Sequence, residues 1–162
     1  MTNDPKAMAA TLSWGLKQSF VAYVEGAGGA IATGEGAARN PEGGFTFAAT
    51  PGEGLRIGAD GKPEGSARFV GEVSFEAHGG MLKVFLADPS VEIGPAGAVL
   101  AVADTRKRDR RVTLAQLDMA AAAVGDDGVW AIPAKLSLDG WQVMGDHYPP
   151  FTPLDPVRLT LG

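Results

Sequence analysis

The sequence contains no cysteine, which excludes disulfides, thiol catalysis, iron–sulfur clusters and cysteine-ligated zinc. Histidine is nearly as scarce, with 2 residues in the chain, and neither an HxH nor an HExxH spacing occurs. A zinc enzyme needs several clustered ligands, and no such motif is present. The Gly-x-Ser-x-Gly elbow of an α/β-hydrolase is also missing. The sequence thus lacks the usual signatures of zinc and serine hydrolases.

Positive charge and long apolar runs are also in short supply. The chain carries 14 Lys and Arg against 19 Asp and Glu, a formal net charge of −5, which argues against nucleic acid as a general partner. No apolar run approaches the roughly 20 residues of a membrane-spanning helix. The start of the chain shows no basic n-region followed by an apolar h-region. We therefore expect a cytoplasmic protein, or an exported or surface-associated one if a signal precedes this sequence.

The residues that are abundant indicate the fold class. A length of 162 residues with 45% hydrophobic content suffices for one domain with a sizeable core. The 23 glycines and 11 prolines favour many turns and short strands over a helical bundle. We expect residues 1–10 to be a flexible lead-in. Residues 11–162 should form a single mainly β domain, either a β-sandwich or a curled antiparallel sheet, with one principal N-terminal α-helix.

The stretch Leu12–Gly26 is predicted to be that helix. Its apolar residues recur every four positions and would stack on one side of an α-helix. They are Leu12, Leu16, Phe20 and Val24. Ser13 is the expected N-cap, and Gly26 is the expected residue just beyond the C-terminus.

A second row on the same predicted helix is the first candidate for a site. Gly15, Ser19 and Tyr23 are also four apart, so two small residues would leave a shallow trough that ends at a tyrosine. Spacing alone favours an ordinary boundary tyrosine, with its ring buried and its hydroxyl in water.

The clearest predicted strand is Ser66–His78, because apolar and polar residues alternate along it. Gly79-Gly80 is expected to close a two-residue hairpin, with Met81–Ala87 as the return strand. Asp88-Pro89 is expected to end that strand. This arrangement would leave His78 at a strand end, where its side chain can lean over a neighbouring site.

A basic run, Arg106-Lys-Arg-Asp-Arg-Arg111, interrupts an otherwise acidic chain. One interpretation is a solvated hairpin tip. The other is an anion contact, with a carboxylate-bearing ligand or with a partner protein. The sequence leaves both interpretations open.

Several segments together resemble the HtaA haem-binding domain family. Trp14-Gly-Leu-Lys-Gln-Ser-Phe-Val-Ala-Tyr23 is similar to the family's opening Trp-Gly-x-Lys-x-Ser-Phe-x-x-Tyr pattern. Phe69-Val-Gly, followed by His78-Gly-Gly-Met-Leu, resembles the central Phe-x-Gly…His-Gly-Gly-x-Leu segment, and Asp88-Pro-Ser-Val-Glu-Ile resembles the segment after it. Tyr148, followed by Thr152-Pro-Leu-Asp-Pro-Val, resembles the closing Tyr…Gly-x-x-Leu-Asp-Pro. These blocks occur in the family's order and span most of the chain.

The resemblance implies a specific ligand and site. In the family, a tyrosine of the helix motif is the axial ligand of ferric haem, and a histidine of the central motif hydrogen-bonds that tyrosine. The matching residues here are Tyr23 and His78. Ser19 and Tyr148 are implied contacts to the haem propionates. The family often has an aromatic residue such as Phe where this chain has His147, which either stacks on the porphyrin or offers a second ligand.

The chemistry of these residue types agrees with that implication. A phenolate is a hard anionic ligand that suits Fe(III), and a histidine N–H is a suitable partner for its oxygen. We therefore expect a protein that binds haem b as ferric protoporphyrin IX for uptake, transfer or storage, and not an enzyme. Haem donor and acceptor proteins would be its further partners. Two alternatives stay open, a haem-dependent enzyme and a β-sandwich module that binds protein or glycan without a cofactor.

Overall fold

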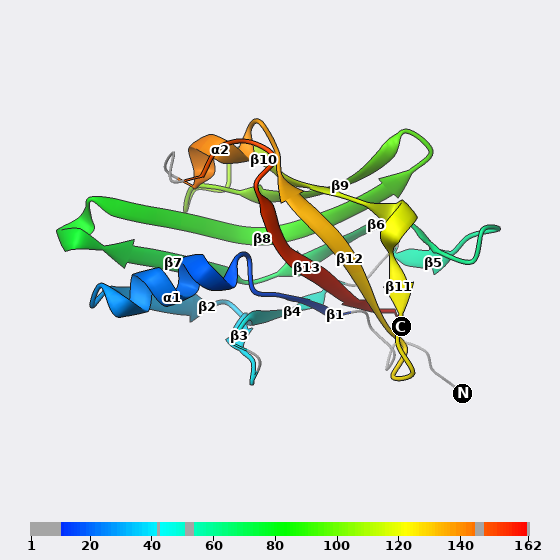
Figure 1. The fold of residues 1–162 in the computed structure, drawn as a ribbon, viewed down its shortest axis with the longest axis horizontal. Coiled ribbons are helices and arrows are strands. Elements are labelled where there is room, and N and C mark those ends of the chain that lie inside the picture. The colour runs from blue at the N-terminus through cyan, green and yellow to red at the C-terminus, as the bar shows by residue number, and fades with distance from the viewer. Residues whose placement is uncertain (1–10, 42, 51–53, 145–147, 162) are drawn as a thin grey trace.

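The computed structural model shows an antiparallel β protein with two helices in its described part, α1 (Gln18–Gly26) and α2 (Gly140–Val143) (Figure 1). The structure describes residues 11–41, 43–50, 54–144 and 148–161. The predicted lead-in of residues 1–10 lies outside this part. The strands are, in chain order, β1 (Thr11–Trp14), β2 (Ala30–Gly34), β3 (Ala38–Arg39), β4 (Phe45–Ala49), β5 (Leu55–Ile57), β6 (Pro63–Val70), β7 (Glu72–Ala77), β8 (Leu82–Gly94), β9 (Gly97–Ala103), β10 (Arg111–Leu117), β11 (Ala123–Val124), β12 (Val129–Leu136) and β13 (Pro153–Thr160).

Eight of these strands close on themselves in the order β8–β9–β10–β12–β13–β1–β4–β6 and back to β8. Every pairing in this closed sheet is antiparallel. The mainly β prediction is confirmed. The β-sandwich alternative is not confirmed, because pairing of β6 with the second half of β8 joins the two edges of one curled sheet into a barrel-like shape.

A smaller unit projects beyond the closed sheet. β8 pairs with β6 through Ser90–Ile93, but its first half, Leu82–Ala87, pairs with β7 instead. β7 in turn pairs with β2, which is the last strand on that side. We call β2, β7 and Leu82–Ala87 the extension. Helix α1 lies alongside β7 and β2 at this end of the molecule (Figure 1), and the rings of Phe20 and Phe75 meet edge to face at 5.1 Å.

The helix begins later than the period-four pattern predicts. Residues Thr11–Trp14 form β1, which pairs with β13 on one side and β4 on the other. Leu12 therefore points into the core from a strand, and Leu16 does so from a bend with φ 60°. Of the four residues in the pattern, only Phe20 and Val24 reach the core from the helix, where Val21 joins them. All four apolar residues are buried as predicted. The backbone conformation at Leu12 and Leu16 is set by contacts with strands distant in the sequence, not by the helical pattern. The helix is accordingly preceded by a strand and is not the first element.

Two predicted strand boundaries are also wrong, for one shared reason. The predicted strand Ser66–His78 is broken at Gly71 (φ +140°) into β6 and β7. The strand predicted to stop at Asp88 continues as β8, with a bulge where Asp88 takes φ +49°. The two irregularities face each other. The Asp88 N–H donates to the Gly71 carbonyl at 2.8 Å, and the Gly71 N–H donates to Asp88 Oδ1 at 3.2 Å.

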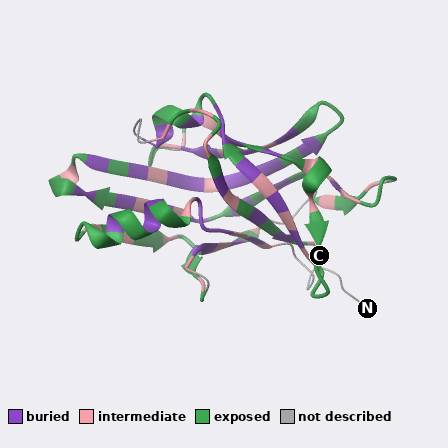
Figure 2. Cartoon of the chain, in the orientation of Figure 1, coloured by how far each residue is buried: buried purple, intermediate pink, exposed green. Residues whose placement is uncertain are grey.

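The core fills the interior of the closed sheet and continues between α1 and the extension. Buried and exposed residues alternate along strands such as β6 and β13 (Figure 2), as a sheet with one buried face requires. Large side chains that are fully buried include Phe69, Leu100, Ile132 and Leu159. No helix in the described ranges is long and apolar enough to cross a membrane.

Candidate functional site

Tyr23 and His78 form a hydrogen-bonded pair at the surface. The Tyr23 hydroxyl oxygen lies 2.6 Å from Nε2 of His78, and the two rings are tilted by 56° with centroids 5.7 Å apart. Tyr23 comes from α1, whereas His78 comes from the turn between β7 and β8. Tyr23 is 47% exposed to solvent. The sequence prediction that these two residues act together therefore has a geometric basis.

A close approach of backbones sets the end of α1 beside the end of β7. A Cβ atom on Gly29 would lie 2.3 Å from the Glu76 carbonyl oxygen and 2.9 Å from Cβ of Ala77, so no larger residue fits there without a shift. The Gly29 N–H also donates to the Val24 carbonyl at 2.9 Å, which ends the helix. This contact brings the last turn of α1, with Tyr23, to the level of the β7–β8 turn.

The turn that carries His78 differs from the predicted two-residue hairpin. His78, Gly79 and Gly80 all have positive φ, at 55°, 66° and 95°, and form a short 3₁₀ turn. The Met81 N–H donates to the His78 carbonyl at 3.2 Å. The left-handed region is unusual for a residue with a side chain, and glycine is the residue that adopts it without steric cost. The His-Gly-Gly sequence thus supplies two such residues directly after the histidine.

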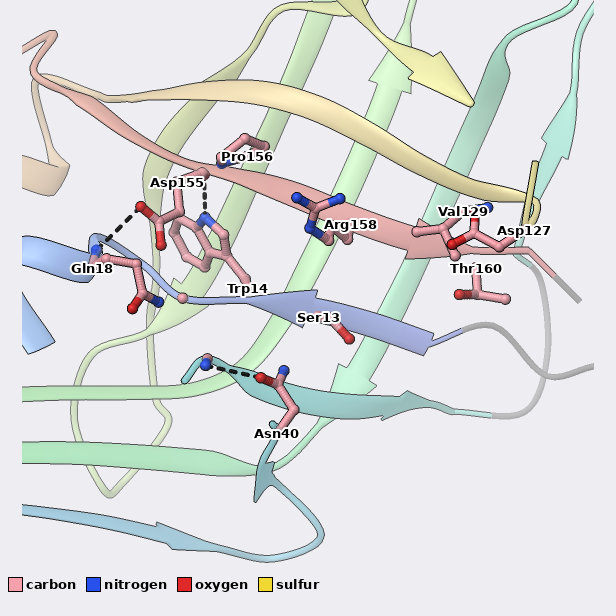
Figure 3. A pocket seen from close by; sticks show the side chains of 12 residues that line it. Ser13, Trp14, Gln18, Asn40, Asp127, Val129, Asp155, Pro156, Arg158 and Thr160 are labelled. Carbon is pink, nitrogen blue, oxygen red and sulfur yellow. Dashed lines mark hydrogen bonds between the residues drawn. The ribbon is translucent and has the colours of Figure 1, made fainter. Parts of the chain in front are cut away.

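The first turn of α1 is fixed from the opposite end of the chain. Lys17 at the N-cap makes no side-chain cap, and Asp155 of β13 supplies one, because its Oδ1 accepts from the Gln18 N–H at 3.1 Å. The Trp14 indole N–H donates to the Asp155 carbonyl at 2.7 Å (Figure 3). A Cβ on Gly15 would lie 2.4 Å from Asp155 Oδ2, so a larger residue there would displace the capping carboxylate.

The remaining predicted site residues gather around Phe20 or lie outside the described part. Ser19 is exposed and precedes Tyr23 by about one helical turn. The Tyr148 ring is half-buried and meets the Phe20 ring edge to face at 6.1 Å. His147 lies outside the described residues, so its predicted stacking or ligating role stays a prediction.

Two residues near the site were not among the sequence candidates. The Lys17 ammonium lies 5.5 Å from the centroid of the Tyr148 ring and donates to the Pro153 carbonyl at 3.2 Å. Asp155 caps α1 as described. Both stand inside the family-like motifs quoted above, so the motifs marked the positions, but nothing in the sequence indicated that the two ends of the chain meet.

A cavity next to these motifs does not contain the pair. It has a volume of about 620 Å³ and follows the outer face of β1 and β13 (Figure 3). Its lining is mainly polar and includes Asn40, Asp155 and Arg158. Tyr23 and His78 lie at the other end of α1, on an open surface. Within the described ranges, no three His, Asp or Glu side chains are grouped so that they would hold a metal ion.

The fold and the site define a class of domain. It is a closed antiparallel sheet with an extension of further strands. A helix packed on that extension carries a tyrosine, which contacts a histidine in a turn between two strands. The chain belongs to the HtaA family, whose sequence model matches residues 9–160.

Solved structures of similar fold agree with this assignment. The C-terminal domain of HtaA from Corynebacterium glutamicum has 26% identity and a TM-score of 0.74, covering 96% of this chain and 98% of that one. The N-terminal domain of the same HtaA has 25% identity and a TM-score of 0.71, covering 95% and 97%. The haem-binding protein HtaB from that organism shares the fold, with 20% identity, a TM-score of 0.66 and coverage of 95% and 94%. No curated protein sequence matches the chain.

Proposed function

We propose that this domain binds ferric haem b, with the Tyr23 phenolate as the axial iron ligand and His78 as its hydrogen-bonding partner. The observation that carries the proposal is the 2.6 Å contact between the Tyr23 oxygen and His78 Nε2 on an accessible surface. Membership of the HtaA family supports haem as the ligand. Haem uptake, transfer or storage is the role that follows.

The donor set fits haem better than a bare metal ion. A free cation needs several protein ligands, and the described residues offer no cluster of them. Haem brings four nitrogen ligands on its own iron, so one protein side chain can complete the attachment. A phenolate suits iron in the ferric state, because it is a hard, negatively charged oxygen.

His78 is proposed to stabilise the charged form of that ligand. A phenol oxygen has room for a hydrogen bond and a metal bond at the same time. When His78 Nε2 carries the proton, its N–H donates to the oxygen and favours the phenolate. Such partners orient a metal ligand and tune its affinity. Because Tyr23 is 47% exposed, a planar macrocycle can reach its oxygen without opening the core.

The rim of the proposed site has groups for the haem carboxylates. Ser19 and Tyr148 are the proposed propionate contacts. Ser19 precedes Phe20 in α1, and the Tyr148 ring contacts the Phe20 ring from outside the helix. Lys17, beside the Tyr148 ring, adds positive charge at the same end. These groups complement two propionates, which are acceptors with negative charge.

We further propose that the domain is a carrier and not an enzyme. A haem enzyme normally places an acid–base group over the open face of the iron. Of the 2 histidines in the sequence, His78 already pairs with Tyr23, which leaves His147. Steady turnover of peroxide or breakdown of haem by the purified holoprotein would favour the haem-dependent enzyme instead.

The test is a titration of the apoprotein with haemin, followed by ultraviolet–visible absorption. We expect a saturable Soret band with stoichiometry of one haem per chain. Tyr23→Phe keeps the ring and removes the ligand oxygen, so it should abolish the ferric tyrosinate spectrum, whereas Tyr148→Phe should keep it. A protein that stays colourless in the titration would support the cofactor-free interaction module.

A further inference from the structure

We propose that Arg108 is a positioning residue for the Tyr23–His78 pair. It joins the extension to the closed sheet through three carboxylates, and so holds His78 at the distance that the hydrogen bond to Tyr23 needs. The part of this inference that concerns ligand binding rests on the proposed function.

The extension leaves the closed sheet at a joint of unusual backbone. The chain passes from β2 toward the closed sheet through Glu35 and Gly36, with φ of 56° and 104°. It passes from β6 to β7 through Gly71, with φ of 140°. Along β8 the change falls at Asp88, with φ of 49°, where the pairing register also shifts. On each of these three strands, the regular strand backbone is therefore interrupted between the extension and the closed sheet. Regular strand pairing alone does not fix the angle between the extension and the closed sheet.

One guanidinium contacts a carboxylate from each of these three connections. Arg108 lies in the turn between β9 and β10, which belongs to the closed sheet. Its Nη2 is 2.7 Å from Glu72 Oε1 at the start of β7. Its Nη1 is 3.4 Å from Glu35 Oε1, just after β2, and its Nε is 3.2 Å from Asp88 Oδ2 in the bulge of β8.

Three of the four side chains in the cluster are partly shielded from solvent, so their charges matter more than those of a surface pair, whereas Glu35 is 56% exposed. The side chains of Arg108, Glu72 and Asp88 are 26%, 22% and 27% exposed. Arg108 Nε is buried and its contact with Asp88 is ionic, without hydrogen-bond geometry. Without Arg108, the three carboxylates would lose the cation that they share. Arg106 would still lie 3.3 Å from Glu72, and Arg111 would still donate to the Asp88 backbone carbonyl at 2.7 Å, but neither contacts all three. Removing one member of such a cluster leaves uncompensated charge.

His78 lies at the far end of β7 from this cluster, so a small rotation of the extension at the cluster produces a larger displacement at His78. Six positions separate Glu72 from His78 along β7, which at about 3.3 Å per residue spans roughly 20 Å. A tilt of about 5° at the joint would move the turn by roughly 2 Å, enough to break a hydrogen bond. The end of α1 packs on β7 at Gly29, but its start is held by Asp155 of β13, so the helix and Tyr23 would not move with the extension as one rigid body.

The same turn provides a matched control. Arg110 carries the same charge and contacts Asp104, at 2.9 Å, with both residues in the β9–β10 connection. Arg110→Met therefore removes one positive charge and one ion pair without touching the joint. Arg108→Lys keeps the charge but loses the planar fork, and serves as the second variant if Arg108→Met does not fold.

The first measurement uses apoprotein and needs no ligand. The chain has 2 histidines, so His147→Ala assigns the imidazole signals in a nuclear magnetic resonance spectrum. Tyr23→Ala gives the position of the His78 signal without its partner. We expect Arg108→Met to move the His78 signal most of the way to that position, Arg108→Lys part of the way, and Arg110→Met not at all. A His78 signal unchanged in both Arg108 variants would overturn the proposal.

The second measurement is a double-mutant cycle on ferric haem release to excess apo-myoglobin. We expect Arg108→Met to speed release by about 10-fold in the natural background, in the range typical of residues that support a metal ligand. In the His78→Ala background we expect less than about a twofold change, since a residue that acts through His78 has nothing left to position. Equal acceleration in both backgrounds would overturn the proposal. If no variant binds haem, the proposed function fails, and the His78 signal still decides the role of Arg108.

Discussion

The indole nitrogen of Trp14 donates a hydrogen bond to the backbone carbonyl of Asp155, 141 positions further along the chain, at 2.7 Å. The same aspartate caps α1 through its side chain (Figure 3). It also donates its own N–H to the Leu16 carbonyl at 2.9 Å. The helix that presents Tyr23 is thus anchored to the last strand of the closed sheet. Loss of this anchor would therefore be expected to displace Tyr23 and disturb the proposed site.

Tyr23→Ala is expected to remove most ferric haem affinity. Its oxygen is the proposed axial ligand, and the neighbouring exposed residues of α1 cannot reach the same point with a comparable group. The measurement is a haemin titration, with affinity taken from the Soret band. Wild-type affinity with an unchanged band would show that the iron ligand is another residue.

His78→Ala is expected to be milder, with a loss of about 10–100-fold in haem affinity. The iron bond would survive, and only the hydrogen bond to the Tyr23 oxygen would be lost. Dissociation rates of the two variants, measured by transfer to apo-myoglobin, make the comparison. If His78→Ala proved as damaging as Tyr23→Ala, His78 itself would be the better candidate for the ligand.

Asp155→Ala is expected to lower the free energy of unfolding by about 1 kcal/mol, the usual cost of losing an N-cap. The mechanism is loss of the acceptor for the Gln18 N–H. Asp139→Ala is the control, since Asp139 stands at the N-cap of α2 and makes no side-chain cap. Urea denaturation gives both values. Equal effects for the two substitutions would argue against a special role for Asp155.

Reduction is expected to weaken haem binding, because a phenolate compensates the charge of Fe(III) better than that of Fe(II). The reduction potential should accordingly be low. Spectra before and after dithionite, with transfer of ferrous haem followed over time, test this. A stable ferrous complex with a six-coordinate bis-histidine spectrum would instead assign the ligands to His78 and His147.

Local pattern predicted burial well and backbone poorly. Leu12 and Leu16 are buried, as their period-four spacing with Phe20 indicates, yet one lies in a strand and the other in a bend. A buried residue satisfies a helical and a strand pattern equally over so short a stretch. Pairing of β1 with β13 decided between them, and that pairing joins the two ends of the chain.

The family-like motifs predicted the residues of the candidate site. The structure shows which contacts bring those residues together. Spacing alone favoured an ordinary boundary tyrosine with a buried ring and a hydroxyl in water. The pairing with His78 depends on the close approach at Gly29. The basic run indicated either a solvated hairpin tip or an anion contact with a ligand or partner protein. The partners of Arg108 are instead carboxylates of the same chain, spread over three strand connections, and only the folded sheet brings them to it.

Anchoring α1 to β13 also has a consequence for the order of synthesis. Chains leave the ribosome N-terminus first, so Tyr23 and His78 emerge well before Asp155. A ribosome-arrested chain that stops before β13 would have the proposed ligand and its partner but neither the cap of α1 nor the last strand of the closed sheet. We expect such arrested chains to bind no haemin, and chains released at full length to bind it at once. The domain would then acquire haem only after the whole fold has been translated, and its binding function would depend on the last strand as much as on the helix that carries Tyr23.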